Sequence, residues 1–254
     1  MGKFLRIHGA SIFSTILSKH NIIISDEMTD NISGEKHRLE SEWTMWELRK
    51  ADARVGLRDW TQLPLPLYHV GTVEDFWICW KRAPRIAEVL SGGNDSYTMK
   101  IKRDEKDEKG GIITRITTAE AYMLFRKGIQ PITEYETAPG KRATAGRWRC
   151  EVAVAPRDFD KWGVAWEIIC LALIGEIVDP AHIINGVYLQ DKHSGKQVAL
   201  RLDIWFAIED DVVCDAVAEE LRSVITEEMQ KRLGVTLPIN FAKIVRGVKK
   251  GGRK

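Results

Sequence analysis

The sequence has few cysteines, a small net charge and no long hydrophobic run, and each of these absences excludes a class of protein. No apolar stretch reaches the roughly 20 residues that a membrane-spanning helix needs, so we expect a soluble protein that does not bind a membrane. The four cysteines form no Cys-x-x-Cys pair and no histidine cluster accompanies them, which favours reduced, mostly buried thiols over a zinc site. The net charge of +2 carries no overall nucleic-acid signature, so RNA binding would require a local basic arrangement.

Motifs of enzyme active sites are also missing. Gly140-Lys141-Arg142 resembles part of a phosphate-binding loop, but Tyr135 stands where the leading glycine belongs and no Ser or Thr follows the lysine directly. The patterns HExxH, GxSxG and GxGxxG are absent. We therefore expect a binding protein that is not an enzyme and uses no cofactor or metal.

With 254 residues, of which 44% are hydrophobic, the chain is long enough for one domain with a substantial core. We divide it into an N-terminal extension over residues 1–36, a domain over 37–245 and a basic tail over 246–254. The extension lacks acidic residues up to Ile24 and has scattered apolar positions at Phe4, Leu5, Ile12, Phe13, Ile16 and Leu17. A flexible extension is favoured, with a mitochondrial presequence as the minor alternative. The tail is expected to be solvated, with RNA phosphates as an alternative contact.

Apolar residues at helical spacing predict three helices. They cover about 72–84, 158–175 and 212–234, and the second begins at Asp158 or Asp160. The first has a threonine cap, and the other two end at glycines.

Strict alternation predicts two strands. Over residues 198–208 it places Arg201 and Trp205 on an open face, and over 147–154 it points Arg147 away from the buried residues. Strands mixed with three separated helices favour an antiparallel α+β domain, with helices covering one face of the sheet and the other face open. The charged insertion at 91–119 shows no periodicity and is interpreted as a solvated loop or hairpin.

Nine tryptophans are the most informative part of the composition. Six lie in buried patterns and are assigned to the core: Trp43, Trp46, Trp80, Trp148, Trp162 and Trp166. Trp60 lies in a polar, proline-flanked loop, where it either folds back on its own domain or faces a ligand. Flat aromatic rings beside arginine and glutamate suit a flat, charged ligand.

Several segments follow one another in the order of a known family. They are His37-Arg38-Leu39, Trp43-Thr-Met-Trp46, Trp60, Thr72-Val-Glu-Asp-Phe-Trp77, Tyr122-Met-Leu-Phe-Arg-Lys-Gly-Ile-Gln-Pro131, Gly146-Arg147-Trp148, Trp166 to Glu176, and Ile204-Trp205. From about residue 37 to 244 the chain resembles the cap-binding translation initiation factors of the 4E family, as a divergent member. The resemblance implies a curved antiparallel β-sheet with three helices packed on the convex face, and a slot on the concave face for the 7-methylguanosine cap of messenger RNA.

The chemistry of such a slot explains the residue types that the resemblance implies. Methylation at N7 charges the guanine ring, so stacking on aromatic faces gains a cation–π term of about 0.5–2 kcal/mol. A carboxylate accepts hydrogen bonds from the guanine edge, and basic side chains hold the triphosphate. The matching positions are Trp60 and Trp205 for the base and its methyl group, and Arg147, Arg201 and Lys192 for the phosphates, with Lys196 as the alternative to Lys192.

One departure from the family pattern concerns the second stacking tryptophan, whose position is Thr133 here. The register favours Glu134 as the guanine acceptor, with Tyr135 as a substitute wall and Glu136 as a competing acid. Loss of one stacking partner costs roughly 1–3 kcal/mol, so weak cap binding is one expected outcome.

The resemblance also implies a partner surface on the back of the domain, where a scaffold initiation factor or binding protein docks a helix. The residues that keep this pattern are His37, Val73, Trp77, Leu171 and Gly175. Arg38 and Glu167 depart from it, which implies a partner with altered, more basic contacts. Periodicity alone favours core packing for Val73 and Trp77, and only the resemblance assigns them to a partner.

The expected function is therefore cap binding in translation initiation or its regulation, in the cytoplasm or also the nucleus. The main alternative is an interaction scaffold of the same fold that has weak or lost cap binding and sequesters translation factors. An enzyme acting on caps is a third, less favoured alternative.

Overall fold

The computed structural model describes residues 36–49, 64–83, 99–106, 112–131, 146–192 and 199–244. Its strands are β1 Arg38–Arg49, β2 Pro64–Thr72, β3 Met99–Lys106, β4 Ile112–Arg126, β5 Gly146–Ala153, β6 Ile184–Asp191, β7 Ala199–Phe206 and β8 Ala242–Lys243. Its helices are α2 Val73–Arg82, α4 Phe159–Ile174 and α5 Asp211–Leu233, with a short 3₁₀ turn η3 at Pro156–Asp158.

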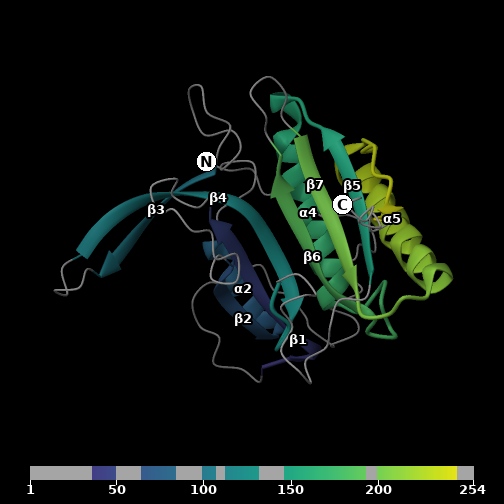
Figure 1. The fold of residues 1–254 in the computed structure, drawn as a ribbon, viewed down its shortest axis with the longest axis horizontal. Helices are drawn as coiled ribbons and strands as arrows, with labels where there is room; N and C mark the ends of the chain where they lie inside the picture. The colour runs from purple at the N-terminus through teal and green to yellow at the C-terminus, as the bar shows by residue number, and fades with distance from the viewer. Residues whose placement is uncertain are drawn as a thin grey trace, which may run out of the picture.

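The strands form one antiparallel sheet in the order β2-β1-β4-β6-β7-β5-β8, and β3 pairs with β4 outside this path. The three helices lie on the same face of the sheet (Figure 1). The predicted α+β class, with an antiparallel sheet covered by helices on one face, is confirmed.

Local signals explain where the helices begin and end. The Thr72 hydroxyl accepts a hydrogen bond from the Asp75 amide and caps α2, and Asp210 caps α5 by accepting from the Val213 amide. Helix α4 ends at Gly175. Helix α5 ends at Gly234, whose φ of 65° is the left-handed conformation that glycine adopts at low cost. All three predicted helices are confirmed within one or two residues.

The main hydrophobic core lies between the helices and the sheet and contains four of the predicted core tryptophans: Trp43, Trp148, Trp162 and Trp166. Trp46 and Trp80 are only partly buried, so their assignment to the core was too simple. Trp80 packs against the main core, whereas Trp46 packs on the opposite face of the sheet.

That opposite face carries a second, smaller buried cluster of Leu48, Ala121, Met123, Phe125 and Trp205. The alternation correctly placed Trp205 on the face away from the main core, but the expectation of an open position is wrong, because Trp205 is 4% exposed. Neighbouring apolar side chains from β4 enclose its ring on this face.

The predicted insertion at 91–119 is a hairpin where the structure describes it. Strand β3 pairs with the first half of β4, from Met99 opposite Ala119 to Lys106 opposite Ile112, and the hairpin extends away from the rest of the sheet (Figure 1). The loop alternative is therefore wrong for these residues, and the rest of the insertion lies outside the described residues. The proposed limits of the extension, domain and tail stay predictions.

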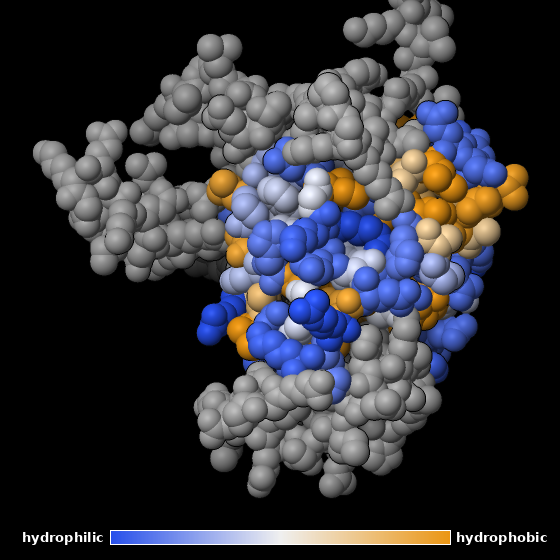
Figure 2. Space-filling model, turned by 90° about the horizontal axis from the view of Figure 1, so that it is seen from below, coloured by the Kyte–Doolittle hydropathy of each residue, from blue (hydrophilic) through white to orange (hydrophobic). Residues whose placement is uncertain are grey.

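One face of the described surface is mostly polar. Seen from below, hydrophilic residues dominate its centre, and apolar residues gather on the right, the side on which α5 lies in Figure 1 (Figure 2). Large apolar residues exposed among the described positions are Ile78, Val212, Val213 and Leu233. No described helix is long and apolar enough to cross a membrane.

Candidate functional site

The strand register aligns the side chains of the concave face in three rows that cross β1, β4, β6, β7 and β5. One row consists of Thr44, Phe125, Gly186, Trp205 and Arg147. The next consists of Trp46, Met123, Tyr188, Asp203 and Arg149. The third consists of Leu48, Ala121, Gln190, Arg201 and Glu151. The face thus changes from aromatic and apolar over β1 and β4 to charged over β7 and β5.

Trp205 occupies the point where the apolar and charged parts of this face meet. Phe125 contacts its ring edge-on, with centroids 5.2 Å apart, and the Tyr188 ring lies nearly parallel to it at 6.4 Å. The Arg147 guanidinium lies over the indole, 5.3 Å from its centroid. Within the described residues, the buried Trp205 Nε1 has no hydrogen-bond partner. The ring therefore has one cationic neighbour and an unused donor.

Gly186 allows this packing because it leaves room for Phe125. A Cβ at this position would lie 2.4 Å from Phe125 Cγ and 2.6 Å from the Leu124 carbonyl oxygen, closer than real Cβ atoms approach other atoms. A side chain here would displace the ring that contacts Trp205. The sequence signal was a lone glycine inside a strand, which indicates close approach of neighbouring groups.

Two of the arginines on this face are paired with carboxylates. Arg149 donates two hydrogen bonds to Asp203, at 2.7 and 2.8 Å, and Arg201 donates two to a single oxygen of Glu151, at 2.9 and 2.8 Å. The hydrogen bond from Arg201 lowers the pKa of Glu151, and the hydrogen bond to Asp203 raises that of Arg149. A phosphate at Arg201 would therefore compete with an existing partner.

Lys192 follows the end of β6, where its backbone N–H donates to the Ala199 carbonyl at 2.8 Å and continues the pairing with β7. By register it lies on the same face as Arg201. The structure thus brings Arg147, Arg201, Trp205 and Lys192 to one face. The other predicted ligand residues lie outside the described residues: Trp60, Glu134, Tyr135, Glu136, Thr133 and Lys196.

On the convex face, contacts at the start of α2 fix His37. Its backbone N–H and its Nδ1 contact the two carboxylate oxygens of Glu74, at 3.0 and 2.6 Å, and its carbonyl accepts from the Val73 amide at 2.9 Å. Burial raises the pKa of Glu74, but the hydrogen bonds from His37 and from the Glu74 backbone N–H together outweigh it and hold that pKa below the ordinary value. The chain before β1 is thereby attached to the first turn of α2.

The other predicted partner residues differ in accessibility. Trp77 is half-buried beside Phe76, whereas Val73, Leu171 and Gly175 are buried. For Val73, the core packing that periodicity favoured is confirmed, since it belongs to the main hydrophobic core.

Glu167, which departs from the family pattern, accepts a hydrogen bond from Arg232 of α5 at 2.9 Å. Its charge is therefore already paired within the chain. A requirement for a more basic partner does not follow from this residue.

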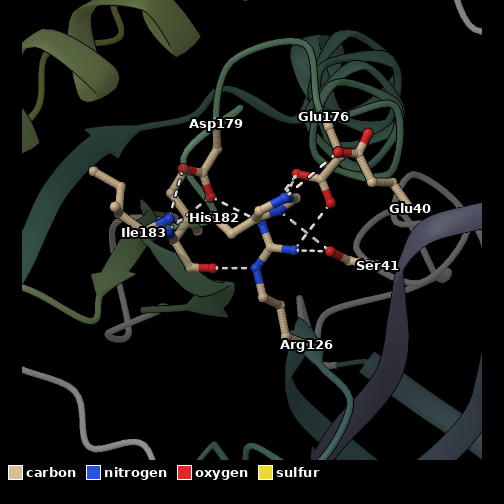
Figure 3. Close-up of polar contacts among 8 residues, drawn as sticks. Glu40, Ser41, Arg126, Glu176, Asp179, His182 and Ile183 are labelled. Atoms are coloured by element: carbon tan, nitrogen blue, oxygen red, sulfur yellow. Dashed lines mark hydrogen bonds and ion pairs between the residues drawn. The ribbon is translucent and has the colours of Figure 1, made fainter.

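A buried polar cluster centred on Arg126 was not predicted from the sequence (Figure 3). The Arg126 guanidinium donates to both oxygens of Glu176, to Asp179, to the Ser41 hydroxyl and to the Ile184 carbonyl. All five of its N–H groups are thus used. The signal available in the sequence was a lone arginine at the end of the apolar run Tyr122-Met-Leu-Phe.

This cluster joins β1, the end of β4 and the loop between α4 and β6. Asp179 also accepts from the Ile183 and Ile184 amides, both at 2.8 Å, so one carboxylate holds both the loop and the arginine. His182 lies 3.4 Å from Glu176 and 3.5 Å from Glu40 (Figure 3). The strand that carries Phe125 is therefore anchored to the loop that follows α4.

Comparison with known proteins relates this chain to one family. A sequence model described as "Eukaryotic initiation factor 4E" matches residues 38–242. The eukaryotic translation initiation factor 4E of Saccharomyces cerevisiae is 27% identical over 176 residues, which are 69% of this chain and 64% of that protein. That of Eremothecium gossypii is 29% identical over 167 residues, which are 65% of this chain and 62% of that protein. The chain thus spans slightly less than two thirds of these relatives.

Solved structures with the same fold include two nematode proteins. Ascaris suum eIF4E-3 in complex with an m2,2,7G cap gives a TM-score of 0.54 at 20% identity, covering 87% of this chain and 96% of that chain. Caenorhabditis elegans eIF4E-3 in complex with the 4E-binding protein Mextli gives a TM-score of 0.51 at 21% identity, covering 75% and 87%. At these identities the likeness shows the fold alone.

Proposed function

Because the chain belongs to the eukaryotic initiation factor 4E family, we propose that its concave face binds the 7-methylguanosine cap of messenger RNA in translation initiation or its regulation. The observation that carries this proposal is the contact between Trp205 and Arg147 at the border of the apolar and charged parts of the face. An aromatic ring beside a cation suits a ligand that joins a flat methylated base to a phosphate chain.

Each described ligand residue has a role that follows from its place. Trp205 contacts the methylated side of the base, and Arg147 next to it contacts the first phosphates. Arg201 and Lys192 lie further along the same face, where the phosphate chain and the following nucleotide continue. Glu134 is assigned to the guanine edge, and Trp60 and Tyr135 to the stacking walls, by their positions in the family pattern. No bond of the ligand is broken.

Isothermal titration of the full chain with 7-methyl-GTP and with GTP tests this proposal. The methylated nucleotide should bind about 2- to 30-fold more tightly, because only it gains the cation–π term. Equal affinities, or no binding of either nucleotide, would contradict cap recognition.

The role of Arg147 is tested by Arg147→Ala, with Arg222→Ala on α5 as the matched control. Loss of a charge-assisted hydrogen bond to phosphate should weaken 7-methyl-GTP binding roughly 10-fold or more. Arg222 pairs with Glu219 on the helix surface at 2.7 Å, so its removal should leave the affinity unchanged. The assignment of Arg147 fails if both variants bind like the wild type.

On the convex face we propose a docking site for a helix of a scaffold initiation factor or binding protein, around Trp77 and the His37–Glu74 contact. Trp77 is the half-buried aromatic residue of this surface, and large aromatic residues often dominate binding energies. Trp77→Ala should abolish capture of a 4E-binding segment such as that of Mextli and leave 7-methyl-GTP binding intact. If Trp77→Ala binds the segment as well as the wild type does, Trp77 is not part of the docking site.

The internal pairing of Arg201 with Glu151 favours one alternative, a scaffold of the same fold with weak cap affinity. Thr133, in place of the second stacking tryptophan, supports it as well. This alternative predicts millimolar 7-methyl-GTP binding together with tight partner binding. Cap affinity in the micromolar range or tighter would exclude it.

A further inference from the structure

A third arginine lies on the concave face, beside the two that the family pattern assigns to phosphate. Arg149 is the next residue of β5 after Arg147 on this face, because side chains of a strand alternate and Trp148 between them belongs to the main core. The pairing of β5 with β7 places Arg149 in the row between those of Arg147 and Arg201. Three guanidinium groups therefore occupy successive rows of this face.

A buried carboxylate holds Arg149 by one edge of its guanidinium group. Nε and Nη2 donate to the two oxygens of Asp203, at 2.7 and 2.8 Å, from the position directly opposite on β7. Such a bidentate pair fixes the plane of the guanidinium group. The Asp203 side chain is only 2% exposed, whereas that of Arg149 is 29% exposed. A ligand on this face therefore reaches the arginine and not its carboxylate partner.

The other edge of this guanidinium group is available to a ligand. Arginine has five N–H groups, and the bonds to Asp203 use one on Nε and one on Nη2. Arg149 has no further hydrogen bond within the described part of the chain, which leaves both N–H groups of Nη1 and one of Nη2. Nη1 and Nη2 form a second fork, and a guanidinium fork binds phosphate through two parallel hydrogen bonds.

Arg201 differs from Arg149 in the exposure of its acidic partner. Glu151 is the more exposed member of that pair, with 46% of its side chain accessible against 21% for Arg201. A phosphate that approaches Arg201 therefore meets a negative charge, whereas one that approaches Arg149 meets the cation alone. The burial of Asp203 makes Arg149 the better prepared of the two arginines.

We propose that Arg149, held in place by Asp203, binds the triphosphate of the cap between the contacts of Arg147 and Arg201. This inference rests on the proposed function, because it extends the same ligand-binding face. Successive residues on one face of a strand lie about 6.4–6.8 Å apart, which allows Arg147 and Arg149 to contact different phosphates of one chain. The site then selects its ligand by the number of phosphates as well as by the methylated base.

The number of phosphates tests this role in the full chain. Titration calorimetry with 7-methyl-GMP, 7-methyl-GDP and 7-methyl-GTP should show that each added phosphate raises the affinity of the wild type. In Arg149→Met with Asp203→Asn, 7-methyl-GTP should bind about 10-fold or more weakly, whereas 7-methyl-GMP should change by less than about 2-fold. This double variant keeps the net charge of the wild type, so the overall charge of the protein cannot explain such a loss.

The matched control removes an ion pair of α5 in the same way. Arg222→Met with Glu219→Gln should leave the affinity for all three nucleotides unchanged, because that pair lies on an exposed helix surface. The role of Arg149 is overturned if the Arg149 and Asp203 double variant folds and still gains as much from the third phosphate as the wild type does. The pair would then serve only to neutralise the buried charge of Asp203.

A milder variant keeps the proposal testable if that double variant does not fold. Arg149→Lys retains a cation beside Asp203 but has no second fork, so 7-methyl-GTP should bind about 3- to 10-fold more weakly, again with little change for 7-methyl-GMP. Urea denaturation shows whether the variant keeps the fold. Wild-type affinity of Arg149→Lys for all three nucleotides also overturns the proposal.

Inorganic tripolyphosphate separates this inference from cap recognition, because it carries the phosphates without the base. The wild type should bind it, and Arg149→Met with Asp203→Asn should bind it at least about 10-fold more weakly. Equal binding by the two proteins overturns the role of Arg149 and leaves cap recognition intact. If Arg149 is needed for tripolyphosphate but the wild type does not distinguish 7-methyl-GTP from GTP, cap recognition fails and the phosphate site stands.

Discussion

Gly186 shows how the absence of a Cβ positions Trp205, a proposed ligand residue on the neighbouring strand. In Gly186→Ala, the added carbon would collide with Phe125 and with the Leu124 backbone, and backbone cannot move aside cheaply. We expect a loss of about 1–3 kcal/mol in the free energy of unfolding, measured by urea denaturation, with weaker 7-methyl-GTP binding.

The matched control for this change is Gly71→Ala in β2. There the new Cβ would meet only the Glu42 side chain, at 3.6 Å, which is an ordinary contact. The control should keep wild-type stability or gain slightly. An equal loss at both positions would show that glycine backbone effects, not the collision with Phe125, determine the result.

The pair between Glu151 and Arg201 predicts an unusual gain of affinity. In Glu151→Gln the guanidinium loses its ionic partner and becomes available to phosphate, so 7-methyl-GTP should bind up to about 5-fold more tightly in titration calorimetry. Glu219→Gln, which breaks a comparable pair with Arg222 on α5, is the control and should change nothing. Weaker binding in Glu151→Gln would mean that Arg201 needs Glu151 to hold its position.

For single residues, the sequence correctly predicted on which face of the sheet a side chain lies, but not how exposed that side chain is to solvent. Alternation is local, so it placed Arg201 and Trp205 on one face from eleven residues of sequence. The exposure of Trp205 depends on Phe125 and Met123, which lie far from it in the sequence. They come close to Trp205 only because β6 places their strand, β4, two positions from β7 in the sheet. The Arg126 cluster was missed for the same reason, because its members come from three separate segments: β1, the end of β4 and the loop between α4 and β6.

At the scale of elements, the start of α2 has a pH dependence with a defined sign. The pKa of Glu74 lies below its unfolded value of about 4.3, so its contribution to stability is complete above that value and is lost as the pH falls through the folded pKa. The difference in free energy of unfolding between wild type and Glu74→Gln should therefore stay constant from neutral pH to about pH 5 and shrink below about pH 4.

Urea titrations of both proteins at a series of pH values measure this difference. A gap that persists unchanged to pH 3 would show that Glu74 acts through packing and not through its charge. Protonation of the carboxylate would also release the His37 contact that precedes β1.

The helices were predictable because each carries its own start and stop signals, such as the cap at Thr72 and the glycine at 234. Strands that are buried on both faces were harder to predict from the sequence. In β4, buried residues run without a break from Ala121 to Arg126, and in β6 six of eight residues are buried. Such central strands show no alternation, so their existence followed only from the family resemblance.

At the scale of the whole molecule, the Arg126 cluster joins three segments that lie far apart in the chain: β1, the end of β4 and the loop that follows α4. Arg126→Met would leave the buried carboxylates of Glu176 and Asp179 without their cationic partner, which typically costs about 3–5 kcal/mol. Thermal and urea denaturation should show this loss. Lys127→Met, one residue further on, removes only an exposed pair with Glu42 and should have little effect.

A second substitution separates charge from packing in this cluster. Arg126→Met with Glu176→Gln removes one of the stranded carboxylates and should recover part of the lost stability. If the double variant loses as much stability as the sum of the two single variants, the arginine contributes through its packing and not through its charge.

The order of the strands also governs how the chain is completed during synthesis. Strand β5 pairs with β7 and β8, both of which leave the ribosome after it, so both of its edges wait for partners. At 5–20 residues per second, the roughly fifty residues that lead to the end of β7 take about 3–10 s to add. A nascent chain in this interval exposes unpaired strand edges to aggregation and to chaperones. A transcript with a premature stop codon before residue 199 should therefore yield a polypeptide for degradation, not a smaller working domain.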